Sequence, residues 1–367
     1  MGQMTDAMDM ITHVALGAIV GELTLGKQAG NRAVLWGALV GLVPELDRLL
    51  RWTHGDWAYL LYGQSLTHSL LFVLLGGLLL GRLFYRLHGR RVGTRRGWVR
   101  LWFWGLLTHV LLDCCSTWGT QLFFPFWSYR VAGNFIAEID PFFTLPLLLG
   151  LLLGLRHARD TRPRNLWVGM GLVLSSLYLL VTITNQQYVR AVFDHTFEQA
   201  DSRVLRMGVY PALGSNLLWH GVAEMPYGYQ VAYFSVFEGA STTLDVHYVP
   251  KRHSLPDSLI NLSQVQTLRR VSDRYYVVST RGDSVLWHDL RFGLGSVLSS
   301  AWTAPAFQCT FLLTPSDQAG HPNVRIERPQ QGLSAEGLRL TWQRILGKSP
   351  SRPSESRPIS DQSDAHN

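Results

Sequence analysis

The sequence is short of the features that define several common classes of metal site and enzyme. It has three cysteines, Cys114, Cys115 and Cys309, and their spacing fits no zinc ribbon. Adjacent cysteines rarely pair with each other, so we expect all three to be small packing residues and not thiolate ligands. The sequence also lacks the His-Glu-x-x-His of zinc proteases, the Gly-x-Ser-x-Gly of serine hydrolases and a P-loop. These absences argue against the three corresponding enzyme classes.

The first ten residues contain no lysine or arginine but do contain Asp6 and Asp9. A cleavable signal peptide begins with a basic region, so none is expected here. We therefore expect the first apolar segment to remain in the mature protein.

Hydrophobicity is distributed unevenly along the chain. The mean hydropathy is only +0.07, but residues 10–189 are dense in Leu, Val, Gly and Trp. This pattern predicts a helical membrane domain over residues 1–189, and a span needs about 20 apolar residues. The expected membrane segments, six in all and two of them short, cover residues 11–25, 33–50, 67–87, 99–124, 142–155 and 166–184.

The net charge of +7 could suggest nucleic-acid binding, but the arginines are grouped in a different way. Seven arginines fall between residues 82 and 100, and four between 156 and 164. Basic loops between membrane segments are typically cytoplasmic, so we expect no nucleic-acid partner. The resulting orientation places the C-terminal domain in the periplasm.

A histidine and an aspartate four residues apart, His109 and Asp113, lie in one of the most apolar parts of the chain. On a helix they share one face, so both side chains can reach one point. Imidazole and carboxylate are common metal ligands and also form acid/base pairs. A simple hydrogen bond that holds two helices together is an equally good explanation of this motif alone.

Further ionisable residues occur at the predicted outer ends of other segments. They are His13 and His68, each preceded by threonine, and the carboxylates Glu45, Asp47 and Asp140. At 1.5 Å per residue, His109 and Asp113 lie roughly 14 and 20 Å beyond Arg100 along their helix. They therefore reach a depth in the membrane similar to that of the ionisable residues on the other segments. This convergence predicts a polar site near the outer leaflet.

The residue types suit a divalent metal, with zinc expected first and manganese or iron as alternatives. The candidate ligands are His13, Asp47, His68, His109 and Asp113, which could complete one site or share two ions. Glu45 and Asp140 are the candidate catalytic residues, either orienting the ligands or serving as a general base. Two other classes stay open: a non-catalytic envelope or stress-response protein with a structural metal, and a proton- or ion-coupled transporter.

From about Ala191 the pattern changes to alternation with turn residues, as in 230–237, 274–279, 285–290 and 306–312. This predicts a small β-rich domain over residues 190–345, placed over the site as a lid or specificity module. Its His220, His247 and His288 lack the spacing of metal ligands and are expected to be surface or packing histidines. The tail 346–367 has almost nothing to bury and is predicted to be disordered.

Several short motifs together resemble the LexA-binding, inner-membrane-associated hydrolases, also described as membrane-bound metal-dependent hydrolases of bacteria. The resemblance covers most of residues 9–345. It is carried by Thr12-His13-x-x-x-Gly17, Pro44-Glu45-Leu46-Asp47, Thr67-His68-Ser69, His109-x-x-x-Asp113-x-x-x-Thr117-x-Gly119 with Pro125-Phe126, Asp140-Pro141 and Asp289-Leu290-Arg291-Phe292-Gly293.

The resemblance implies an inner-membrane hydrolase that uses a divalent metal held by His13, Asp47, His68, His109 and Asp113. Glu45 stands where the family often has aspartate, and Gly63-Gln64 where it often has His-Arg, which puts a full second metal site in doubt. We expect a lipid-like substrate, and a phosphoester suits water activated by a metal.

Overall fold

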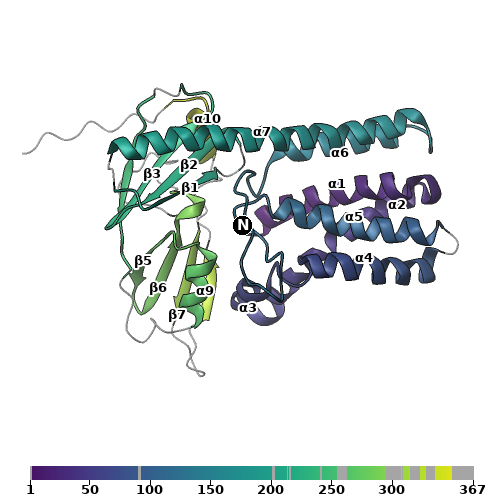
Figure 1. The fold of residues 1–367 in the computed structure, drawn as a ribbon, viewed down its shortest axis with the longest axis horizontal. Coiled ribbons are helices and arrows are strands. Elements are labelled where there is room, and N and C mark those ends of the chain that lie inside the picture. The colour runs from purple at the N-terminus through teal and green to yellow at the C-terminus, as the bar shows by residue number, and fades with distance from the viewer. Residues whose placement is uncertain are drawn as a thin grey trace, which may run out of the picture.

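The computed structural model describes residues 2–89, 92–200, 203–212, 214, 216–239, 242–253, 263–294, 307, 309–314, 323–327 and 335–348. The predicted disorder of residues 346–367 falls almost wholly outside this part of the chain. A helical bundle comes first, and two antiparallel sheets follow it (Figure 1).

The bundle is built from seven α-helices. They are α1 (Gly2–Ala29), α2 (Asn31–Leu42), α3 (Leu49–Tyr62), α4 (Leu70–Phe84), α5 (Arg95–Asp113), α6 (Pro141–Leu155) and α7 (Arg162–Ala200). A short 3-10 helix, η1 (Pro44–Arg48), joins α2 to α3, and a π-helical turn, η2 (Tyr85–Gly89), extends α4. All but α3 run side by side, and α3 lies across their ends (Figure 1).

Helices α1 and α2 are in very close contact because glycines face each other between them. A methyl group added to Gly37 would lie 2.2 Å from the carbonyl oxygen of Gly17. The equivalent distance from Gly41 to the carbonyl oxygen of His13 is 2.4 Å. Small residues allow helices to approach in this way, and the contact brings the backbone of α2 against His13.

The second predicted segment, 33–50, is not one helix. Helix α2 ends at Leu42, just before Pro44, and the chain turns through η1 into the crosswise α3. Proline lacks the N–H that would continue the helical hydrogen bonds, which explains the break. The turn carries Glu45 and Asp47 toward the bundle, where both are buried.

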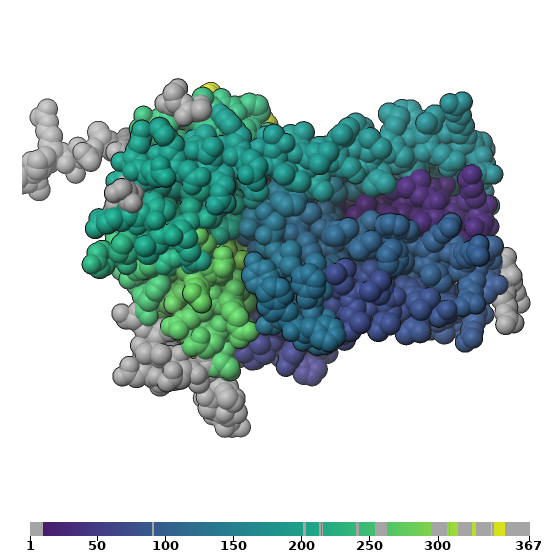
Figure 2. Space-filling model, in the orientation of Figure 1, coloured from purple at the N-terminus to yellow at the C-terminus, as the bar shows by residue number. Residues whose placement is uncertain are grey.

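The fourth predicted segment, 99–124, is also shorter than expected. Helix α5 ends at Asp113, and the chain continues as a loop that reaches Asp140. Thr120 and Val131 form an isolated β-bridge within this loop. Figure 2 shows the loop in blue, between the green β-sheet part and the rest of the bundle.

By length and apolar composition, two helical stretches of the described chain could cross a membrane, Leu70–Gly89 and Arg162–Ala200. The shorter apolar helix Pro141–Leu155 accompanies them. The number six for the membrane segments therefore stays a prediction. Large apolar side chains are exposed along one side of α4, namely Leu71, Leu74, Leu75, Leu78, Leu79 and Leu83.

The β-rich part contains two four-stranded antiparallel sheets. The first has the order β1 (Arg206–Pro211), β2 (Leu218–Glu224), β3 (Gly228–Ser235) and β4 (His247–Pro250). The second has the order β5 (Tyr276–Arg281), β6 (Ser284–Asp289), β7 (Thr310–Thr314) and β8 (Asn323–Glu327). Helices α9 (Ser263–Val271) and α10 (Ala335–Ile345) and the 3-10 turn η3 (Leu290–Phe292) complete it.

The predicted strands 230–237, 274–279 and 285–290 correspond to β3, β5 and β6 with small shifts at the ends. The fourth, 306–312, overlaps the start of β7 and otherwise lies partly outside the described residues. The domain boundary predicted at residues 189–190 falls within α7, which continues to Ala200 (Figure 1). Val189, Val192, Phe193 and Phe197 of α7 pack with Trp219 and other residues of the first sheet in one hydrophobic core. The spacing of these four apolar residues is that of a helix buried on one side.

Candidate metal centre

His109 and Asp113 lie one turn apart at the end of α5, as their spacing predicted. The Nε2 atom of His109 is 3.3 Å from Oδ2 of Asp113. The Nδ1 atom of His109 lies 2.8 Å from the carbonyl oxygen of Gly41 on α2. A carbonyl oxygen only accepts, so Nδ1 carries the proton and the neutral ring directs the lone pair of Nε2 into the site.

His68 reaches the same point from the start of α4. Ser69 caps that helix, its hydroxyl accepting a hydrogen bond from the N–H of Phe72. The Nδ1 atom of His68 faces Oδ2 of Asp47 at 3.3 Å, and its Nε2 atom lies 3.1 Å from Oδ2 of Asp113. With Nδ1 donating to Asp47, the Nε2 lone pair of His68 also points inward.

Three acceptor atoms therefore meet with no proton between them in the neutral state. The Nε2 atoms of His68 and His109 are 3.3 Å apart, and each lies within 3.3 Å of the same carboxylate oxygen of Asp113. Acceptors packed this closely repel one another unless a cation or an added proton lies among them. The arrangement is thus either a metal site or a protonated imidazole–carboxylate cluster.

The size of this triangle fits a zinc ion. Zinc binds imidazole nitrogen and carboxylate oxygen at about 2.0–2.2 Å in tetrahedral geometry, which separates neighbouring ligand atoms by about 3.3–3.5 Å. The observed separations of 3.1, 3.3 and 3.3 Å are close to that value. The Gly41 carbonyl and Asp47 are partners of the kind that fix the ring orientation of metal-binding histidines.

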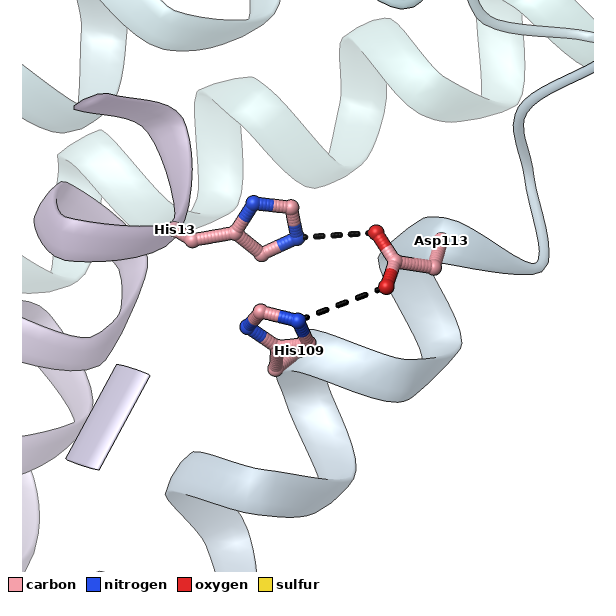
Figure 3. A group of neighbouring side chains, drawn as sticks. All are labelled: His13, His109 and Asp113. Carbon is pink, nitrogen blue, oxygen red and sulfur yellow. Dashed lines mark ion pairs between the residues drawn. The ribbon is translucent and has the colours of Figure 1, made fainter. Parts of the chain in front are cut away.

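His13 approaches Asp113 from α1 on the other side. Its Nε2 atom lies 3.0 Å from Oδ1 of Asp113, and its ring centroid is 3.8 Å from that of His109 (Figure 3). One ligand atom from each of His13, His109 and Asp113 lies within 4.8 Å of the others. Asp113 thus directs one oxygen to His13 and the other to His68 and His109. This division is compatible with a fourth ligand to one ion or with an aspartate shared by two.

Glu45 lies beside the cluster and not at its centre. Its Oε1 atom is 3.8 Å from Nδ1 of His13 and 4.0 Å from Nε2 of His109. Its other oxygen is paired with the guanidinium of Arg48, one turn along η1. The carboxylate therefore has one atom directed at the histidines and one held by a cation, which suits a group that accepts a proton near the site.

Asp140 does not join the cluster, and the expectation that it orients a ligand or acts as a base gains no support from its position. Its Oδ1 atom accepts a hydrogen bond from the N–H of Phe142 at 3.0 Å, which caps α6. Its Oδ2 atom accepts one from the hydroxyl of Tyr178 at 2.8 Å. One oxygen thus caps α6, and the other joins the start of α6 to α7. Aspartate followed by proline is a common start of a helix, and this signal outweighs the catalytic interpretation.

The six gathered side chains are all buried. His13, His68 and His109 are each 1% exposed, and the most accessible are Glu45 and Asp47 at 9%. The accessible edge of the site is therefore η1. Exposed apolar residues flank this edge: Leu46 in η1, Leu49 directly after it, and Leu66 before His68. A hydrogen bond from the Thr67 hydroxyl to the Pro44 carbonyl oxygen, 3.0 Å long, joins the two flanking segments.

Sequence reasoning missed two participants. Gly41 takes part through its main-chain carbonyl oxygen, which no sequence pattern indicates. Arg48 follows the Pro44–Asp47 motif directly, and its spacing of three from Glu45 could have suggested the pair. The buried, bidentate pair of Glu22 and Arg164, with bonds of 2.6 and 2.8 Å, was also unforeseen and joins α1 to α7 far along the bundle from His13.

Comparison with known proteins bears on the helical part. Residues 8–189 match the model of a family described as YdjM inner membrane protein. The match supports a membrane-associated family for this region and points to the inner membrane. The chain is also 24% identical over 208 residues to the uncharacterized protein YfhP of Bacillus subtilis (strain 168), covering 54% of this chain and 61% of that protein. No solved structure matches the chain.

Proposed function

We propose that this protein is a metal-dependent hydrolase of the bacterial inner membrane. The observation that carries the proposal is the triangle formed by Nε2 of His68, Nε2 of His109 and Oδ2 of Asp113. These residues, with His13, would hold a divalent ion, zinc first, while Asp47 and the Gly41 carbonyl fix the ring orientations. When bound, such an ion lowers the pKa of a coordinated water and polarises an ester group.

Glu45 is the proposed general base. Its Oε1 atom faces the histidines, and Arg48 holds the other oxygen, so the carboxylate is kept in one orientation. In this role Oε1 takes a proton from the attacking water and later returns it to the leaving group. The position of Glu45 at the accessible edge places this proton transfer where a substrate would enter.

A lipid-like substrate is proposed from the surroundings of that edge. Leu46, Leu49 and Leu66 expose 47–56% of their surface there, and the exposed leucines of α4 begin immediately beyond. A substrate with acyl chains could place them on this surface while its ester reaches Glu45. A phosphoester is the bond class that best suits the cationic centre and Arg48 together.

The test is a hydrolysis screen with the zinc-loaded, full-length protein in phospholipid nanodiscs. Release of phosphorylated headgroups or of phosphate is expected from the wild type. Glu45→Gln should lower the rate about 100-fold or more, because a general base contributes that much, and should leave bound zinc unchanged. Glu198→Gln, an exposed site on α7, is the matched control.

Loss of zinc together with activity in Glu45→Gln would contradict its assignment as a base. Full activity in that variant would contradict it equally.

A structural metal in a non-catalytic envelope protein is the second candidate, and the burial of the cluster favours it. Structural zinc sites are closed by four protein ligands, and His13, His68, His109 and Asp113 could supply four. In that case chelation should lower the melting temperature strongly, while no ester in the screen is cleaved. Hydrolysis by the zinc-loaded wild type would exclude this alternative.

A further inference from the structure

The segment from Asp289 to Gly293 lies in the β-rich part and carries a buried ion pair. Asp289 is 0% exposed and Arg291 is 5% exposed. Oδ2 of Asp289 accepts a 2.7 Å bond from the guanidinium, while Oδ1 accepts from the N–H and Nε of Arg291 at 3.0 and 3.1 Å. Burial lowers the pKa of the Arg291 guanidinium, but the Asp289 carboxylate outweighs burial and raises it, so the charge is retained.

The remaining nitrogen of this guanidinium, Nη1, contacts the helical part of the protein. It donates a hydrogen bond to the carbonyl oxygen of Thr117 at 3.3 Å. Thr117 belongs to the loop after α5, four residues beyond Asp113. The neighbouring Trp118 is buried in the core of the second sheet, with its ring centroid 5.9 Å from that of Phe292 and 6.4 Å from that of Phe311.

The loop is tied directly to the ligand. The backbone N–H of Ser116 and its hydroxyl both donate to the carbonyl oxygen of Asp113, at 3.1 and 2.9 Å. Arg130 holds the other side of the loop through the carbonyl oxygen of Gly119 at 3.2 Å. The last turn of α5, with Asp113 on it, is thus anchored through Thr117 to a guanidinium from another part of the fold.

The geometry points to Arg291 as a positioning residue for Asp113. Through this residue the β-rich part would influence how tightly the candidate centre binds its metal. This inference rests on the proposed metal site. The planar fork of arginine suits the role, because two arms can be fixed by Asp289 while a third holds a carbonyl oxygen. A lysine could keep the charge but not all of these bonds.

The test uses the full-length protein in detergent, with zinc as the probe and a chromophoric chelator as competitor. Arg291→Gln is expected to weaken zinc binding by about tenfold or more, as other changes to groups supporting metal ligands do. Arg291→Lys should give an intermediate loss. The matched control is Arg281→Gln on β5, since Arg281 forms an exposed pair with Glu327, and the zinc affinity of this variant should equal that of the wild type.

Hydrogen exchange of the metal-free proteins supplies a second measurement. Arg291→Gln should speed exchange over residues 110–120 and leave β1–β3 as protected as in the wild type. Unchanged exchange in this segment, or unchanged zinc affinity, would overturn the inference. If Arg291→Gln fails to fold, the comparison of Arg291→Lys with the wild type decides by the same two readouts. A wild type that binds no zinc refutes the proposed function, while the exchange experiment still decides whether Arg291 positions the loop.

Discussion

Main-chain carbonyl oxygens set the orientation of several histidines in this protein, with different consequences at each position. The Nδ1 atom of His109 donates a hydrogen bond to the carbonyl oxygen of Gly41, which leaves Nε2 facing Asp113. The Nε2 atom of His220 donates a hydrogen bond to the carbonyl oxygen of Arg291 at 2.9 Å, and its buried Nδ1 atom has no hydrogen-bond partner among the described residues. The first bond leaves the Nε2 lone pair of His109 facing the imidazole–carboxylate cluster, whereas the second leaves the Nδ1 lone pair of His220 buried in the β-rich part. The same local bond thus serves a site in one place and packing in the other.

His220 should make the β-rich part sensitive to acid. Burial lowers its pKa to about 4, although its bond to the Arg291 carbonyl oxygen opposes this. Because the unfolded chain takes up the proton near pH 6.5, the neutral ring stabilises the fold above that pH. This contribution is lost as the pH falls toward 4, by up to about 3 kcal/mol.

The measurement is denaturant unfolding of the full-length protein at pH 7 and pH 4.5, followed by near-UV circular dichroism. His220→Gln should lose less stability between the two values than the wild type does. Some acid sensitivity should remain, because burial also lowers the pKa of His288 to about 4. An equal loss in the variant and the wild type would contradict this assignment.

At the level of whole elements, the contact between α1 and α2 positions two parts of the site at once. It carries His13 on α1 and the Gly41 carbonyl oxygen on α2, and glycines make the close approach possible. Any widening of this contact should move the acceptor that orients His109.

Gly37→Ala is expected to destabilise the protein by about 1–3 kcal/mol, because the added methyl would meet the Gly17 backbone and force the helices apart. It should also weaken zinc binding. Gly169→Ala on α7 is the control, since nothing lies within 4 Å of its added methyl, and it should be neutral or slightly stabilising. Thermal unfolding and zinc titration of both variants provide the measurement. Equal behaviour of the two variants would show that the close contact is unimportant.

Part of the candidate site could be predicted from sequence patterns in the helical elements. The four-residue spacing of His109 and Asp113 predicted one shared helix face, and their contact follows directly from helix geometry. The Thr-His pairs and the Pro44–Asp47 motif predicted residues that the fold brings together. Asp140 did not follow, because its capping bond to Phe142 competes with any role at the cluster. The crosswise α3 and the loop after Asp113 depend on packing against the second sheet through Leu60 and Trp118, which local patterns do not record.

In the molecule as a whole, the bundle and the β-rich part share a hydrophobic core. Leu60 of α3 and Trp118 of the loop are packed with Val265, Trp287 and Phe311, while α7 runs from the bundle along the first sheet (Figure 1). The β-rich part was expected to lie over the site as a lid or specificity module. Its contacts with α3 and with the loop after α5 make it a structural support for the candidate site, and a role as a lid stays a prediction.

The central claim is that the buried histidines and Asp113 hold a metal ion and not merely an extra proton. The most direct measurement is the metal content of the purified protein, determined by elemental analysis after equilibration with zinc. The wild type should retain at least about one ion per chain, and His109→Ala and Asp113→Ala should lose it. His54→Ala, which removes an exposed histidine of α3, should retain it. A wild type without bound metal, or a His109→Ala variant with the same content, would contradict the account and leave a protonated imidazole–carboxylate cluster.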